Sequence, residues 1–337
     1  MKTHIEKCLS GEHLTVSEAS NALDTIMTGQ ATDSQIAGLL IALRAKGESV
    51  DELVGFAQTM RDHSVKVSIE DSDAIDMCGT GGDGSGTFNI STVASFVAAG
   101  AGVTIAKHGN RSVSSQCGSA DVLTALGVNI QCSSETMQAC INRIGIGFLF
   151  APLYHPAMKY AAKTRTELGV RSIFNMIGPL TNPAGVKRQL IGTYHPRAVN
   201  LLGGALQKLG AEKACVVHSD DGLDEVALSV GTHVQEVTRN EQLREYQLQP
   251  EDFGFAKLTL DGLRGGDKNA NAAIAMSVLN GGRSSARDVV VANAALGIYV
   301  SGKVKTFLEG KQKAEESIQS GKALEKLRKL IQYTDQP

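Results

Sequence analysis

The chain has 337 residues, of which 42% are hydrophobic and 20% are charged, and its formal net charge at pH 7 is −2. This length fits one large domain together with a small one, and the composition is that of a globular protein. A slightly acidic balance argues against a general nucleic-acid-binding protein, which usually carries net positive charge. No apolar run approaches the length needed to span a membrane. We therefore expect neither nucleic acid nor a membrane as a partner.

The six cysteines are scattered along the chain, and none forms a Cys-x-x-Cys pair. The N-terminal residues also show no apolar core of a signal peptide. These features predict reduced thiols and a cytoplasmic protein, without a zinc ribbon or a disulfide framework.

Residues 1–70 are predicted to form a small helical domain. Three capping boxes mark helix starts, and each is followed by apolar residues at helical spacing. The boxes are Thr15 with Glu18, Thr32 with Gln35, and Ser49 with Glu52. This segment has no catalytic character, so packing or dimerisation is the expected role.

Residues 71–337 alternate short β-rich runs with helical runs, which predicts an α/β domain with a mostly parallel central sheet. The expected strands are 74–77, 103–106, 144–150, 189–194 and 214–218. The expected helices are 91–100, 119–126, 197–209, 269–280, 286–300 and 304–332, the last of them facing solvent. Residues 226–260 alternate less regularly and are expected to be antiparallel.

The most unusual stretch is a glycine-rich loop that begins at Gly79. It contains five glycines in eight residues, followed by Thr87 and by the polar start of a helix at Asn89, Ser91 and Thr92. Glycine loses much backbone entropy on folding and offers no packing area, so such a cluster indicates close approach of the backbone to a ligand. Loop amides and a helix N-terminus together favour an anion, and phosphate is the usual one.

Residues 79–84 match the Gly-x-Gly-x-x-Gly pattern of dinucleotide-binding domains, but that pattern alone is weak evidence. The following helix begins too late for the tight turn of such domains. The next expected strand is followed by Lys107, where a dinucleotide-binding domain places an acidic residue for the ribose. A cation at this position favours a phosphate ligand, and no P-loop lysine motif is present.

Two more clusters follow expected strands and so should lie at the same sheet edge. Residues 107–115 carry a Lys, a His, an Asn, an Arg and three Ser, while Ser119 is expected to cap the next helix. Residues 220–225 carry four carboxylates, ending in Asp224 and Glu225, which repel one another unless a cation is bound. Acidic turns are also common without a ligand, but beside a phosphate loop they favour Mg²⁺.

A fourth cluster contains His155 in a loop after a strand and Arg165 in a helix. These two residues could close a pocket for a small anion. Taken alone, His155 is more often a structural residue and Arg165 a surface charge.

Together these strings resemble the anthranilate phosphoribosyltransferase family over essentially the whole chain. The motifs that carry the resemblance are GTGGD at 79–83, FNIST at 88–92, KHGNRSVSS at 107–115, GPLTNP at 178–183, and Asp224-Glu225. The resemblance implies a homodimer with a small helical domain and a large α/β domain. It also implies Mg²⁺-dependent transfer of phosphoribose from phosphoribosyl pyrophosphate to the amine of anthranilate, a step of tryptophan biosynthesis. In this arrangement the helical domain forms a wall of the acceptor site, and residues 165–185 are expected to pack with it.

The resemblance also assigns residues by matching positions. Phosphoribosyl pyrophosphate would be held by Gly79, Gly82, Asp83, Thr87, Asn89, Ile90, Ser91, Thr92, Lys107, His108, Gly109, Asn110, Arg111, Ser112, Val113, Ser114, Ser115 and Ser119. Anthranilate would contact Gly79, Asn110 and Arg165, with His108, His155, Gly178 and Pro179 along its path. Mg²⁺ would be bound by Ser91, Asp224 and Glu225. Gln116, Cys117 and Ser172 depart mildly from the family pattern.

Two alternatives stay open on the sequence. A pyrimidine nucleoside phosphorylase shares this fold but resembles the chain only in general terms. A non-enzymatic nucleic-acid-binding paralogue should show a basic face and degraded motifs, which this chain does not. Association with a separate anthranilate synthase cannot be decided from the residues.

Overall fold

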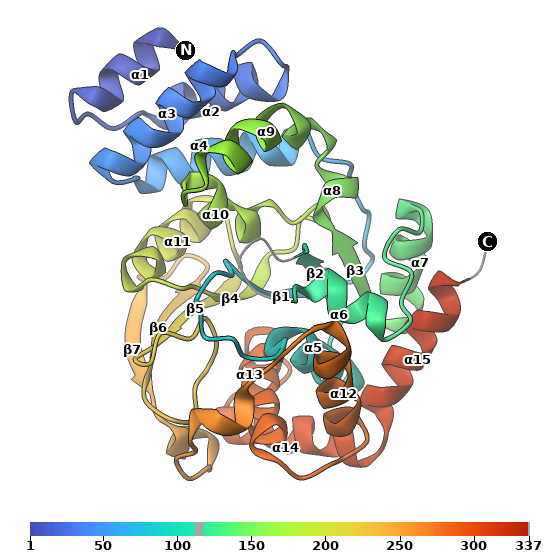
Figure 1. The fold of residues 1–337 in the computed structure, drawn as a ribbon. Coiled ribbons are helices and arrows are strands. Elements are labelled where there is room, and N and C mark those ends of the chain that lie inside the picture. The colour runs from blue at the N-terminus through green and yellow to red at the C-terminus, as the bar shows by residue number, and fades with distance from the viewer. Residues whose placement is uncertain (112–116, 336–337) are drawn as a thin grey trace.

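The fold, a computed structural model that describes residues 1–111 and 117–335, consists of a helical domain and a larger α/β domain (Figure 1). The helical domain begins with α1 (Lys2–Leu9), α2 (Val16–Met27), α3 (Asp33–Lys46) and α4 (Val50–Asp62). The three predicted capping boxes are all present, at the starts of α2, α3 and α4.

The α/β domain is built on a seven-stranded sheet with the order β3-β2-β1-β4-β5-β6-β7. Its strands are β1 (Ile75–Gly79), β2 (Ile105–Gly109), β3 (Ile146–Phe150), β4 (Arg188–Gly192), β5 (Lys213–Ser219), β6 (Thr232–Thr238) and β7 (Arg244–Leu248). Strands β1 to β5 are parallel, whereas β6 and β7 run antiparallel. The predicted mostly parallel sheet and its antiparallel extension are both confirmed.

Helices and short 3₁₀ turns connect the strands. The α-helices are α5 (Ile90–Gly100), α6 (Ser119–Ala125), α7 (Ser134–Ile144), α8 (Ala151–Tyr154), α9 (Lys159–Leu168), α10 (Ile173–Ile177), α11 (Pro196–Lys208), α12 (Lys268–Leu279), α13 (Ser285–Val300), α14 (Phe307–Gln319) and α15 (Lys322–Thr334). The 3₁₀ turns are η1 (Pro156–Met158), η2 (Gly178–Thr181), η3 (Pro250–Phe253) and η4 (Leu260–Leu263).

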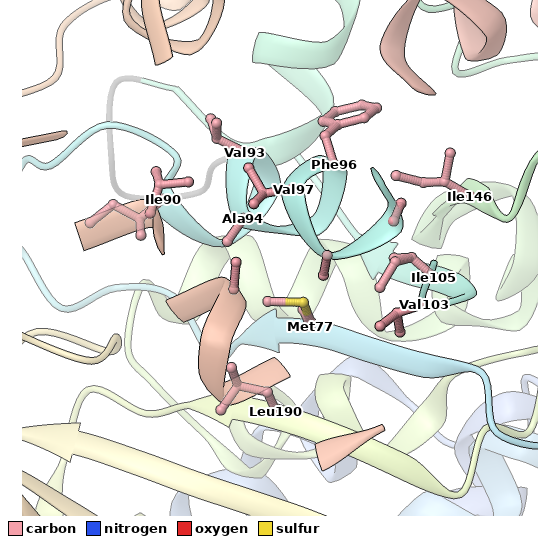
Figure 2. Packing of buried hydrophobic residues seen from close by; sticks show 14 of the residues in the cluster. Met77, Ile90, Val93, Ala94, Phe96, Val97, Val103, Ile105, Ile146 and Leu190 are labelled. Carbon is pink, nitrogen blue, oxygen red and sulfur yellow. The ribbon is translucent and has the colours of Figure 1, made fainter. Parts of the chain in front are cut away.

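Each face of the sheet packs into a different hydrophobic cluster, because successive side chains of a strand point to opposite faces. On β4, Leu190 belongs to the cluster that contains α5 and α13, while Ile191 belongs to the cluster shared with the helical domain. Met77 of β1 points to the same side of the sheet as α5, where Ala94 and Val97 also lie in the cluster (Figure 2). The sheet is therefore covered on both faces, as a parallel sheet requires.

Two later helices, α9 and α10, pack against the helices of the N-terminal domain. Ala161 of α9 and Ile173 and Phe174 of α10 lie in the same hydrophobic cluster as buried residues of α2, α3 and α4. The rings of Phe56 and Phe174 meet edge to face, with centroids 6.1 Å apart. The segment that carries Arg165 is thus fixed against the N-terminal helices.

The structure differs from the sequence expectations at several elements. Strand β2 runs from Ile105 to Gly109, so Lys107 and His108 lie on the strand and not in the loop after it. The expected helix 304–332 is two helices, separated where Gly321 adopts a φ of 75°. The second of these, α15, does not face solvent, because Leu324, Leu327 and Leu330 are buried in the core. Helix α7 was not expected from the sequence.

Across the described ranges, the structure contains no helix that is both long enough and apolar enough to cross a membrane.

Candidate active site

The glycine-rich loop and the acidic loop meet where the direction of the strand order reverses. From β1 the chain builds outward to β2 and β3, and then returns to place β4 on the other side of β1. In open α/β sheets, ligands bind at this switch point, beyond the carboxyl ends of the strands. Gly79 ends β1 and Gly192 ends β4 at this edge.

Asp224 lies directly between these two strand ends. A methyl group built on Gly79 would come within 2.7 Å of Asp224 Oδ2, and one on Gly192 would come within 1.5 Å of the Asp224 carbonyl oxygen. Only glycine leaves space for this acidic residue at either position. The backbone amide of Gly81 donates a hydrogen bond of 3.1 Å to Asp224 Oδ2. The acidic loop is therefore built into the base of the glycine loop.

Glu225 reaches the N-terminus of α5, where its Oε1 accepts a hydrogen bond of 3.0 Å from the Ser91 amide. Helix N-termini attract negative charge, which accounts for this contact. Burial raises the pKa of both Asp224 and Glu225 well above their ordinary values. Repulsion from Asp83 raises the pKa of Asp224 further, and repulsion from Asp224 does the same for Glu225.

Asn293 holds this acidic loop from the core side. It is fully buried on α13, and its side chain accepts a 2.9 Å hydrogen bond from the Val226 amide and donates one of 3.0 Å to the Val226 carbonyl. These two bonds fix the backbone directly after Glu225.

Lys107 provides the cation of the site from β2. Its Nζ donates to the carbonyl of Met77 and to Ser91 Oγ at 3.3 Å, so it lies between β1 and the start of α5. Beneath it, Asp76 is completely buried and accepts hydrogen bonds from the His108 amide at 3.0 Å and from Asn182 Nδ2 at 2.8 Å. Burial raises the pKa of Asp76 to about 6, although nearby Lys107 opposes the rise.

Two imidazoles lie close together on the side of the helical domain. The rings of His108 and His155 are 5.2 Å apart between centroids, and both are buried. Burial, assisted by the neighbouring His155, lowers the pKa of His108 to about 3, and burial lowers that of His155 to about 4. Both rings are therefore neutral at pH 7.

Arg165 of α9 is half buried, with its guanidinium 4.9 Å from the centre of the Phe174 ring. Within the described part of the chain, no carboxylate pairs with it, and burial lowers the pKa of its guanidinium. A partly desolvated cation without a counterion is suited to binding an anionic ligand.

The second polar cluster is described only in part. Asn110 is exposed after β2, and its carbonyl accepts a 3.2 Å hydrogen bond from Ser119 Oγ at the start of α6. Arg111 forms an ion pair of 2.7 Å with Asp121. Ser112, Val113, Ser114 and Ser115 lie outside the described residues, as does Gln116.

The remaining predicted residues surround these groups. Asn89, the N-cap residue of α5, receives a 3.1 Å hydrogen bond from Asn271 and donates to the carbonyl of Cys117. Thr87 pairs with Arg264 in a short β-bridge, and Ile90 and Thr92 are buried on α5. Gly178 and Pro179 lie on η2, where the Pro179 carbonyl accepts from Gln189.

The described residues do not enclose a metal ion by themselves, since no group of three or more His, Cys, Asp or Glu surrounds a common point in these ranges. Mg²⁺ does not require such a cage, because it keeps several waters and binds through one or two carboxylates plus substrate phosphates. Asp224 and Glu225 are adjacent acids held in a repulsive environment, which a divalent cation would relieve. The donor set therefore fits Mg²⁺.

Sequence reasoning missed several residues that shape the site. It gave no role to Asp76, Arg171, Tyr194, Asn271 or Asn293. A charged residue inside the apolar run of β1 and an asparagine inside the apolar run of α13 were the available signals, since buried polar groups need partners. Arg171 gave no such signal, because it is exposed in a polar segment. Tyr194 gave none because it ends an expected strand, where an aromatic residue is common.

Comparisons with known proteins agree over the full chain. Residues 71–324 match the family model "Glycosyl transferase family, a/b domain", and residues 2–64 match "Glycosyl transferase family, helical bundle domain". A curated relative from Pelotomaculum thermopropionicum, an anthranilate phosphoribosyltransferase, is 50% identical over 99% of this chain and 96% of its own. The crystal structure of that enzyme from Thermus thermophilus superposes with a TM-score of 0.93 at 39% identity, covering 99% of both chains. The structure of the Saccharomyces cerevisiae enzyme in complex with phosphoribosyl pyrophosphate and Mg superposes with a TM-score of 0.91 at 29% identity. The match covers 98% of this chain and 97% of the yeast chain.

The two neutral imidazoles predict a loss of stability in acid. Between pH 6.5 and about 3 the unfolded chain binds more protons at these positions than the native chain does, so the free energy of unfolding falls as the pH falls through this range. We expect His155→Gln to weaken the decrease in melting temperature between about pH 7 and pH 4. Calorimetry at several pH values measures the slope of melting temperature against pH for each variant. His195→Gln, at an exposed histidine, serves as the control. Equal slopes in both variants would contradict the prediction.

Proposed function

The chain belongs to the anthranilate phosphoribosyltransferase family, and we propose that the strand ends at the switch point form its active site. The enzyme transfers the phosphoribosyl group of phosphoribosyl pyrophosphate to the amine of anthranilate and releases pyrophosphate, in tryptophan biosynthesis. The family match supports this reaction over the phosphorylase and the nucleic-acid-binding alternatives.

The observation that carries the site assignment is the position of Asp224 and Glu225. These acids lie between the glycine loop and the N-terminus of α5, with Lys107 beside them. Loop amides and a helix N-terminus favour phosphate, while paired carboxylates favour a divalent cation. A ligand that satisfies both is a pyrophosphate carried with Mg²⁺.

We assign Ser91, Asp224 and Glu225 as the ligands of Mg²⁺. When bound, the ion would neutralise the negative charge that develops on the leaving pyrophosphate. The solved yeast relative was obtained with phosphoribosyl pyrophosphate and Mg, which supports this metal here. Phosphoribosyl pyrophosphate is assigned to the glycine loop, to the start of α5 and to residues 107–115 and Ser119, of which 112–115 lie outside the described residues.

The acceptor site is proposed on the side of the helical domain. Arg165 offers its guanidinium to the carboxylate of anthranilate, a charge-assisted contact. His108 and His155 are neutral, so they line the path without adding charge, together with Gly79, Asn110, Gly178 and Pro179. The helices of the N-terminal domain form the wall behind Arg165.

Catalysis by this chain rests on positioning and electrostatics. Breaking the bond at the ribose C1 places positive charge on the sugar and negative charge on the departing pyrophosphate. Lys107 and the amides of the glycine loop are placed to stabilise that negative charge. The amine of anthranilate is unprotonated at neutral pH, so Arg165 needs only to orient it for attack.

The proposal also includes a homodimer formed through the helical domain and a cytoplasmic location. Leu9 of α1 is 70% exposed and Ile41 of α3 is 42% exposed, on helices that lie at the outer edge of the molecule (Figure 1). We place the dimer interface on this face because the family resemblance implies a dimer and these two apolar side chains would be covered there. In the described ranges none of the six cysteines is joined in a disulfide, and five of them are buried, which supports a reducing compartment.

The function is tested by the fluorescence of anthranilate, which should decrease only when phosphoribosyl pyrophosphate and Mg²⁺ are both present. Glu225→Gln keeps an acceptor for the Ser91 amide but removes the charge that would bind the metal. We expect the Mg²⁺ concentration for half-maximal rate to rise about 10- to 100-fold or more.

The exposed Glu251 provides the matched control, since Glu251→Gln removes the same charge away from the site. Unchanged Mg²⁺ dependence in Glu225→Gln would remove this residue from the metal site. Anthranilate consumption without added phosphoribosyl pyrophosphate would contradict the reaction itself.

Arg165→Ala should raise the KM for anthranilate by about 10- to 100-fold, since a hydrogen-bonded charge contact is lost. The KM for phosphoribosyl pyrophosphate should change little. Initial rates at varied concentrations of each substrate separate the two constants. An equal or larger effect on phosphoribosyl pyrophosphate would exclude Arg165 from the acceptor site, and Arg165→Lys should recover part of the loss.

Sedimentation equilibrium should give twice the chain mass of 35.5 kDa. Ile41→Glu should shift the protein toward the single chain, because it places a charge in the proposed interface. Leu308→Glu, on an exposed leucine of α14, should leave the mass unchanged. A single-chain mass for the unaltered protein would contradict the dimer, and dissociation by Leu308→Glu would place the interface elsewhere.

A further inference from the structure

Arg171 connects three parts of the structure that surround the glycine loop. Its Nη2 donates a hydrogen bond to the carbonyl of Gly82, and its guanidinium lies 3.9 Å from the centre of the Tyr194 ring. Its own carbonyl accepts a hydrogen bond from Arg44 on α3. The residue thus links the glycine loop to the loop after β4 and to the helical domain.

The hydrogen bond to the Gly82 carbonyl also determines the direction of the amide that follows it. A peptide unit is planar and trans, so fixing the direction of a carbonyl fixes the following amide in the opposite direction. By holding the Gly82 carbonyl, Arg171 therefore sets the direction of the Asp83 amide. That amide belongs to the loop proposed to bind phosphoribosyl pyrophosphate.

The glycine loop needs such a constraint. Gly81, Gly82, Gly84 and Gly86 all have positive φ, at 64°, 80°, 74° and 67°. A chain with this many glycines has many accessible conformations, and ordering them on ligand binding costs conformational entropy. An external hydrogen bond that holds the loop before binding lowers this cost.

The ring of Tyr194 holds Arg171 in turn. Stacking on an aromatic face restricts the guanidinium plane and contributes a cation–π attraction. The backbone amide of Tyr194 also donates a hydrogen bond of 3.3 Å to Thr80 Oγ1, at the start of the same loop. Arg171 and Tyr194 therefore contact the loop from one side as a pair.

We propose that Arg171, stacked on Tyr194, is a positioning residue that orders the glycine loop for phosphoribosyl pyrophosphate by holding the Gly82 carbonyl. The inference rests on the proposed function of this loop. It assigns Arg171 no contact with the reacting atoms and no part in binding anthranilate.

Isothermal titration of phosphoribosyl pyrophosphate into the full chain with MgCl₂ measures this role without the acceptor. We expect Arg171→Ala to raise the dissociation constant about tenfold, the value of one hydrogen bond to a charged donor at an exposed site. Arg171→Lys should recover little, because an ammonium cannot stack and donate in the same plane. Tyr194→Leu should raise the constant as well, and combining it with Arg171→Ala should add nothing further.

Arg44→Ala is the matched control, because it removes the contact between α3 and the Arg171 carbonyl but leaves the guanidinium on Gly82. We expect its dissociation constant to equal that of the unaltered protein, and melting temperatures are compared for all variants. An unchanged constant in Arg171→Ala, full recovery by Arg171→Lys, an equal rise in Arg44→Ala, or additive effects with Tyr194→Leu would overturn the inference.

The same titration separates this inference from the proposed function. If the unaltered protein binds phosphoribosyl pyrophosphate but transfers nothing to anthranilate, the proposed reaction fails, while the variants still decide the role of Arg171. If it does not bind phosphoribosyl pyrophosphate, both proposals fail.

Discussion

The site depends on the close packing of Asp224 against two strand ends. A side chain at Gly79 would collide with the Asp224 carboxylate, and one at Gly192 would collide with its carbonyl. The acidic loop can reach the switch point only because both positions lack a Cβ. From the core, Asn293 completes the arrangement by holding the backbone after Glu225. The glycine loop and the carboxylates thus pack directly against each other as one unit.

This packing has an electrostatic consequence for ligand binding. The N-terminus of α5 would attract a phosphate, but in this structure the Ser91 amide donates to Glu225. A bare phosphate arriving there would meet Asp83, Asp224 and Glu225. Burial, and then repulsion among these acids, raises the pKa of the latter two. A cation bound together with an incoming phosphate would relieve this repulsion. The residues proposed to bind the metal therefore favour a phosphate that arrives with one.

The parts of the proposed site that depend on local composition could be predicted from the sequence. Glycines, a helix start and an acidic turn predict phosphate and Mg²⁺ without any knowledge of tertiary contacts, and alternating strands and helices place them at one sheet edge. Partners that come from distant segments could not be predicted. Arg171 lies 89 residues from Gly82 along the chain, and the sequence around neither residue indicates that the two are in contact. The end of β2 was misplaced for a related reason, since Lys107 and His108 are polar but pair with Phe148 and Leu149 of β3. On the other side, Asp76 and Asn182 satisfy backbone groups of the strand.

The distribution of charge also explains how the enzyme can work without a general base. The charges assigned to the two substrates are separate: Asp224, Glu225 and Lys107 for the proposed pyrophosphate, and Arg165 for the proposed acceptor. His108 and His155 are kept neutral by burial, so no imidazolium competes with Arg165 for the proposed acceptor carboxylate. A neutral amine then needs orientation more than activation. Because Arg165 and Arg171 belong to one segment packed against the helical domain, the same wall would orient the proposed acceptor and position the loop proposed to hold the donor.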